Sequence, residues 1–82
     1  MKATVLVRPK DGILDPQGEA VTSSLQHLGF SVREARIGRV IDLELVDADD
    51  ASARAALERM CEQLLANPLI ESYEIRIDEN GR

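Results

Sequence analysis

Two stretches of the sequence alternate apolar and polar residues in the way that a β-strand does. In residues 2–8 (KATVLVR), the side chains of Ala3, Val5 and Val7 fall on one face, because successive side chains of a strand point to opposite sides. Residues 71–78 (ESYEIRID) repeat the alternation. Each stretch therefore predicts a strand with one buried face.

A longer β-like segment covers residues 30–46 (FSVREARIGRVIDLELV). Its second half alternates cleanly, whereas the apolar residues of its first half change parity near Arg33 and Glu34, which is typical of a bulge or bend. Gly38 lies between the halves and could form a tight turn or a kink inside one bent strand. The pattern favours two strands that meet near Gly38.

Two stretches have helical periodicity. Residues 16–28 carry apolar side chains three or four positions apart, after Asp15 as an N-cap and Pro16 as a first helical residue, and before Gly29. Residues 50–66 have a similar apolar stripe, which follows acidic capping residues. Two helices, at 16–28 and 50–66, are predicted.

The predicted order β-α-β-β-α-β in one short chain favours an α+β, ferredoxin-like two-layer sandwich. An antiparallel sheet would carry both helices on one face. We expect a single domain over residues 1–82, with residues 79–82 as a frayed tail. The second sheet face would carry scattered aliphatic residues and is a candidate surface for dimerisation.

Composition narrows the function. The chain has 82 residues and a net charge of −5, which argues against binding to nucleic acid or to an anionic membrane. The sequence has no apolar run of about 18 residues, so no membrane span is expected. A single cysteine favours the cytoplasm. Because the core must be small and aliphatic, oligomerisation is favoured as a further source of buried surface.

Few residues suggest chemistry. His27 lies off the apolar stripe of its helix, and no partner for a catalytic base is visible. Cys61 lies on the apolar stripe of the second helix, where Glu58 and Glu62 would raise its pKa. The acidic run at residues 47–50 is better explained by helix capping than by a cation site. No motif for nucleotide, zinc or nucleophilic chemistry is found.

Polar residues in two places exceed what a core requires. Arg33, Arg36 and Arg39 form a local basic cluster, which would suit either a solvated strand edge or a contact with phosphate or an acidic partner. Gly18 in a helical first turn costs about 1 kcal/mol relative to Ala. It is better explained if another backbone, such as that of a neighbouring chain, comes close.

Three stretches resemble one family when taken together. They are LDPQGEAV (14–21), RIGRVIDLEL (36–45) and MCEQLLANPLIESYEI (60–75). In order and spacing they are similar to PurS, the small subunit of phosphoribosylformylglycinamidine (FGAM) synthase. The resemblance covers nearly the whole chain. The region between them, DADDASARAALER, is its most individual part.

The resemblance implies a required subunit of a C–N bond-forming ligase in de novo purine biosynthesis, which converts formylglycinamide ribonucleotide (FGAR) to FGAM. A glutaminase, PurQ, supplies ammonia, and a synthetase, PurL, uses ATP and magnesium. The small subunit would have no catalytic residue, cofactor or metal of its own. It would form a homodimer or homotetramer, join the two enzymes and assist ammonia transfer.

We hypothesise that the partner interface includes six residues of the first-helix entrance and the bend: Asp15, Gln17, Gly18, Arg36, Gly38 and Arg39. Two other functional classes are weighed against the subunit. One is a dimeric ligand-binding regulatory module of the amino-acid-sensing (ACT-like) type, which shares the predicted element order. The other is a small free-standing enzyme that uses His27 or Cys61.

Overall fold

The computed structural model describes residues 1–46 and 49–78. The predicted tail at 79–82 and the first half of the acidic run lie outside the described residues. The elements are β1 (Lys2–Pro9), α1 (Pro16–His27), β2 (Arg39–Glu44), α2 (Asp50–Met60), a π-helical turn η1 (Cys61–Leu65) and β3 (Glu71–Asp78).

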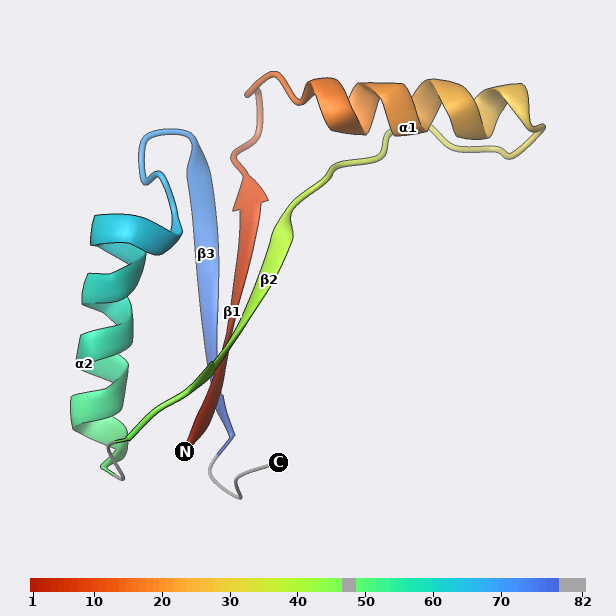
Figure 1. Ribbon diagram of the computed structural model, residues 1–82. Helices are drawn as coiled ribbons and strands as arrows, with labels where there is room; N and C mark the ends of the chain where they lie inside the picture. Colours follow the sequence, from red (N-terminus) through yellow and green to blue (C-terminus); the bar gives the residue numbers. More distant parts are fainter. Residues whose placement is uncertain (47–48, 79–82) are drawn as a thin grey trace.

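The three strands form an antiparallel sheet in the order β2-β1-β3. In the central strand, Val5 lies opposite Ile41 of β2 and Ile75 of β3. One face of β1 is fully buried, and α2 packs along this face on the β3 side (Figure 1). The hydrophobic core consists of Ala3, Val5, Val7, Leu57, Cys61 and Ala66.

The α+β class, the antiparallel sheet and both helices are confirmed. The α1 N-cap is Asp15, as predicted, and Gly29 has the positive φ of 95° that favours glycine just after a helix. Asp49 caps α2 by accepting a hydrogen bond of 3.1 Å from the Ser52 N–H. The second helix ends in η1, where the Ala66 N–H donates to the carbonyl of Cys61, five residues earlier.

Two details of the predicted sandwich are wrong. Residues 30–38 form no strand, so the order is β-α-β-α-β, and there is no hairpin at Gly38. In addition, α1 runs away from the end of the sheet instead of covering it, and residues 28–38 return alongside it (Figure 1). The physical reason is that amides of the returning segment bind α1 side chains: Ala35 N–H donates to Thr22 Oγ1 at 2.8 Å.

We call α1 and the returning segment, residues 16–38, the arm. The arm makes the chain elongated, with principal extents of 48 × 28 × 14 Å and a radius of gyration of 15.9 Å. A compact domain of this length would have a radius of gyration of about 12 Å. Gly18 is the only residue of α1 that is buried, so the arm lacks a core of its own.

Leu57 of α2 tests the location of the core. Its side chain is fully buried, so Leu57→Ala should lower the free energy of unfolding by about 2–5 kcal/mol. Leu64→Ala is the matched control, because Leu64 lies on the same helical segment but is 83% exposed. Urea denaturation followed by circular dichroism measures both variants. Equal losses of stability would contradict this assignment of the core.

Candidate functional site

The six residues predicted to contact partners all lie where the arm meets the sheet. We call this region, residues 9–18 and 36–39, the junction. Its centre is the Asp15 carboxylate, which joins two segments: Oδ1 accepts from the Gly18 N–H at 3.0 Å, and Oδ2 accepts from the Ile37 N–H at 2.9 Å. One side chain therefore caps α1 and also holds the returning segment. The Gln17 side chain is exposed.

Two glycines of the junction permit close backbone approaches. A Cβ on Gly18 would stand 2.5 Å from the Ala35 carbonyl oxygen and would collide with the Asp15 carboxylate. A Cβ on Gly38 would collide with the Val7 carbonyl group of β1. The sequence correctly indicates that a backbone approaches Gly18, and within this chain the backbone is that of Ala35.

Two of the three clustered arginines pair within the chain. Arg36 Nη1 lies 3.1 Å from the Asp11 carboxylate, and Arg36 also donates to the Pro9 carbonyl. Arg39 is held by Glu71 through two hydrogen bonds of 2.8 and 3.1 Å. The Arg33 side chain is exposed on the arm. The predicted basic cluster is thus divided between separate ion pairs.

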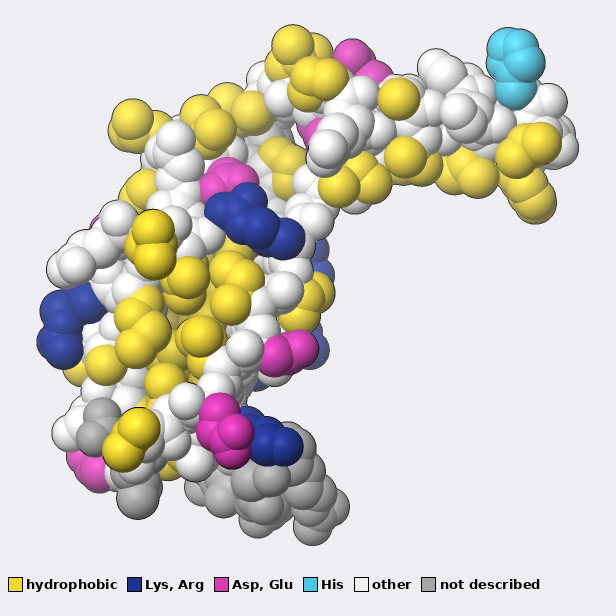
Figure 2. Space-filling view, in the orientation of Figure 1, with side chains coloured by type: hydrophobic (Ala, Val, Ile, Leu, Met, Phe, Trp, Pro, Cys, Tyr) yellow, Lys and Arg dark blue, Asp and Glu magenta, His cyan; other side chains and the backbone are white. Residues whose placement is uncertain are grey.

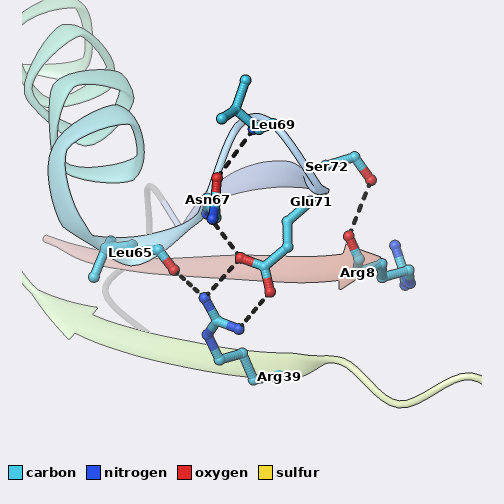
Figure 3. A network of polar contacts seen from close by, with 7 residues as sticks. All are labelled: Arg8, Arg39, Leu65, Asn67, Leu69, Glu71 and Ser72. Atoms are coloured by element: carbon cyan, nitrogen blue, oxygen red, sulfur yellow. Dashed lines mark hydrogen bonds and ion pairs between the residues drawn. The ribbon is translucent and has the colours of Figure 1, made fainter. Parts of the chain in front are cut away.

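Arg39 and Glu71 form the centre of a polar network that crosses the sheet from β2 to β3 (Figure 3). Arg39 also donates to the Leu65 carbonyl at 2.6 Å, at the end of η1. Glu71 accepts from the Asn67 N–H at 2.7 Å. The network therefore fixes the turn that connects η1 to β3.

The carboxylates of Asp15 and Glu71 have lowered pKa values. The pKa of Asp15 lies below its usual value because the Ile37 N–H, followed by the Gly18 N–H, stabilises the charged form. The pKa of Glu71 is lowered by the hydrogen bonds from Arg39 and then by the Asn67 N–H. Both contributions to stability are present at neutral pH and are lost as the pH falls through the lowered folded-state pKa values.

A groove at the junction combines these polar groups with exposed aliphatic side chains. Its apolar lining includes Ile13, Leu14, Ile37 and Ile70. Leu14 is 72% exposed, and the neighbouring Leu69 is 84% exposed. The sequence analysis missed these residues as interface candidates. The sequence does contain a signal for them: Leu14 and Leu69 lie in turn-rich stretches, where no periodic pattern predicts that they are buried.

The other candidate residues, Cys61 and His27, are not part of a recognisable catalytic arrangement among the described residues. Cys61 is buried, and burial raises the pKa of its thiol, with smaller contributions from Glu62 and Glu58. His27 is exposed near the end of α1. Among residues 1–46 and 49–78, no three His, Cys, Asp or Glu side chains could hold a metal ion together. In the same residues, no helix has the length and apolar character needed to cross a membrane.

Comparison with known proteins decides the family. The family model PurS, phosphoribosylformylglycinamidine (FGAM) synthase, matches residues 2–79. The chain belongs to the PurS family. It is therefore a subunit of FGAM synthase, a ligase complex of purine biosynthesis, and the ACT-like alternative is not favoured.

Individual relatives agree along almost their whole length. The FGAM synthase subunit PurS of Methanocaldococcus jannaschii is 37% identical over 79 residues, which cover 95% of each chain. The structure of Bacillus subtilis PurS has a TM-score of 0.85 at 37% identity and covers 95% of this chain and 98% of that one. A chain of the Thermotoga maritima PurLQS structure has a TM-score of 0.83 at 33% identity, with coverages of 92% and 93%.

The polar network predicts that substitution of Arg39 lowers the stability of the fold more than substitution of an arginine outside the network. Arg39→Ala removes a two-pronged contact with Glu71 and a donor to the Leu65 carbonyl, so we expect a loss of about 1 kcal/mol in unfolding free energy, the upper end for exposed ion pairs. Arg76→Ala is the control, because Arg76 pairs with Glu74 on the same strand. Chemical denaturation at pH 7 compares them. A larger loss for Arg76→Ala would refute the assigned role of the network.

Gly18→Ala tests the close approach within the arm. The new Cβ must displace the Ala35 carbonyl or the Asp15 carboxylate, at a cost of about 1–3 kcal/mol. We expect the amides of Ala35 and Ile37 to exchange with solvent roughly tenfold faster, as measured by NMR hydrogen exchange. Gln17→Ala is the neighbouring control and should leave both rates unchanged. Unchanged exchange in Gly18→Ala would show that the arm tolerates the extra carbon.

Proposed function

We propose that this chain is a non-catalytic link in FGAM synthase. In this role it joins a glutaminase, PurQ, to a synthetase, PurL, and assists the passage of ammonia between them. A PurS chain is present in the T. maritima PurLQS structure, and its similarity to this chain extends over 92% of the residues. This similarity supports PurL and PurQ as partners. ATP and magnesium are proposed to bind in the synthetase, with no cofactor in this chain, which acts in the cytoplasm.

One observation carries the proposal: the junction exposes aliphatic side chains while several of its charged groups are bound within the chain. Asp15, Arg36 and Arg39 all bind partners within the chain. They are therefore better suited to holding the shape of the junction than to chemistry. Leu14 and Ile70 remain open at the same groove, 72% and 41% exposed.

Such a surface suits a linking subunit. An aliphatic cluster surrounded by fixed polar groups resembles the core and rim of a protein interface. Because a linker acts by excluding water from an assembly and fixing its geometry, it needs no nucleophile. The elongated shape lets one chain contact more than one neighbour. We further propose that the chain associates with itself as a homodimer, with a homotetramer as the larger alternative.

Leu14→Asp tests the junction as the surface for the enzyme partners. A buried charge should weaken capture of the synthetase by at least about tenfold, since central interface residues contribute more than 1 kcal/mol. Leu64→Asp places the same charge on another exposed leucine, in η1, and serves as the control. Tagged chain is mixed with purified synthetase and glutaminase, with glutamine and Mg-ADP, and capture and glutamine-dependent FGAM formation are measured.

Size-exclusion chromatography of each variant alone checks that self-association is retained. Wild-type capture and activity in Leu14→Asp would remove the junction from the interface. Absence of any capture by the unaltered chain would overturn the linking function itself.

A further inference from the structure

The loop that leads from η1 into β3 is held by a dense set of hydrogen bonds. We call this loop, residues 66–70 (ANPLI), the entry loop. Each of its N–H groups has an acceptor, in the pairs Ala66–Cys61, Asn67–Glu71, Leu69–Asn67 and Ile70–Asn67. Its remaining residue, Pro68, has no N–H, and its ring fixes φ. The entry loop is therefore ordered before any partner binds.

Arg39 holds the entry loop from the other edge of the sheet. It lies on β2, and β1 separates it from Glu71 on β3. The Glu71 carboxylate accepts two hydrogen bonds from Arg39 and one from the Asn67 N–H. Arg39 also donates to the Leu65 carbonyl, directly before the loop. One arginine therefore fixes both ends of the entry loop (Figure 3).

The far side of the entry loop carries an exposed leucine. Leu69 is 84% exposed, and in Figure 3 its side chain lies beyond Asn67, away from Arg39. The hydrogen bonds of the loop use its backbone and the Asn67 side chain, so the connection itself does not require an apolar side chain at this position. Because the backbone of Leu69 is already ordered, little conformational entropy is lost when a partner takes up the side chain. Leu69 is thus suited to anchor a partner.

The entry loop adjoins the groove of the junction. Ile70 lines this groove together with Leu14, and the Ile70 carbonyl accepts from the Lys10 N–H of the junction at 2.9 Å. Figure 2 shows hydrophobic side chains gathered at this end of the molecule, where the loop and the junction lie in Figure 1. Residues 67–70 are exposed and uncharged. A partner that covers the groove therefore also meets Leu69, and the matching pocket on that partner is apolar.

We propose that Arg39 is a positioning residue for the binding of the synthetase. Through Glu71 and Leu65 it holds the entry loop, and the loop presents Leu69 to an apolar pocket of the synthetase. Both terminal nitrogens of Arg39 bind within the chain, so Arg39 acts on binding without contacting the partner. This inference rests on the proposed function, in which the junction binds the synthetase.

Hydrogen exchange measured by NMR tests whether Arg39 orders the entry loop. In Arg39→Ala, we expect the amides of residues 67, 69 and 70 to exchange about tenfold faster relative to the amide of Val5, whose exchange reports global unfolding. Arg76→Ala is the control, because Arg76 pairs with Glu74 outside the network, and it should leave this ratio unchanged. An unchanged ratio in Arg39→Ala would contradict the positioning role.

Arg39→Lys provides a graded second variant. Lysine keeps the positive charge, but it cannot make a two-pronged contact with Glu71 and reach the Leu65 carbonyl at the same time. We expect loop exchange and synthetase binding between those of the unaltered chain and Arg39→Ala. Circular dichroism checks the fold of each variant, and Arg39→Lys replaces Arg39→Ala throughout if the latter does not fold.

A double-mutant cycle tests whether Arg39 acts through Leu69. Immobilised chain is titrated with purified synthetase in the presence of glutaminase, glutamine and Mg-ADP. Leu69→Ala should weaken binding at least about tenfold, whereas Leu64→Ala, which truncates a leucine that is 83% exposed on η1, should not. Arg39→Ala should weaken binding about tenfold, chiefly by slower association, because only chains with an ordered loop can bind.

The double variant decides between positioning and direct contact. Once Leu69 is truncated, Arg39→Ala should weaken binding by less than about a further twofold, because the loop no longer carries the anchor. Additive losses would mean that Arg39 contacts the synthetase itself, and they would overturn the positioning role.

The remaining outcomes separate this inference from the proposed function. Unchanged binding by Leu69→Ala, with weakened binding by Leu14→Asp, would overturn the inference and leave the linking function standing. Failure of the unaltered chain to bind synthetase would overturn both. If Leu69→Ala weakened only glutaminase capture, or changed the oligomer size in size-exclusion chromatography, the entry loop would belong to another interface, and its assignment to the synthetase would be wrong.

Discussion

The Asp15 carboxylate is the contact on which the unusual shape of this chain depends. One oxygen caps α1, and the other holds the Ile37 amide of the returning segment. Because both segments bind the same side chain, α1 and residues 28–38 form one body, the arm. Gly18 is required for this arrangement because a side chain there would occupy the place of the Ala35 carbonyl. The same side chain thus acts as a helix cap and as a tertiary contact.

A second polar contact fixes the sheet beside the arm. Arg39 follows Gly38 directly, at the point where the returning segment becomes β2, and it reaches Glu71 at the start of β3. Asp15 and Arg39 therefore hold the two sides of the junction. Both are charged residues that contact polar groups instead of forming a catalytic site. This use of charge agrees with the non-catalytic role proposed for this chain.

The apolar surface that stays exposed favours the proposed assembly. The chain folds a small aliphatic core between α2 and the sheet, but the arm and β2 keep much of their apolar surface exposed. A small domain gains most of its stability by burying apolar surface, and the apolar surface that stays exposed here does not contribute to the stability of the monomer. Exposed aliphatic residues at the junction and along the arm give the chain two distinct surfaces. One suits the proposed enzyme partners, and the other suits a second copy.

The sequence by itself determined the elements whose signals are local. Alternation placed β1 and β3. Asp15 and the acidic residues before α2 placed the helix starts, because a capping side chain bonds an amide three residues away. Family membership was also readable from three separated stretches. The conformation of residues 30–38 could not be read from the sequence. The pattern of this segment permits a strand. Only the tertiary hydrogen bonds that the Ala35 and Ile37 amides donate to Thr22 and Asp15 decide that it follows α1 instead. The exposed groove of Leu14 and Ile70 likewise arises from residues 56 positions apart, which no local periodicity can bring together.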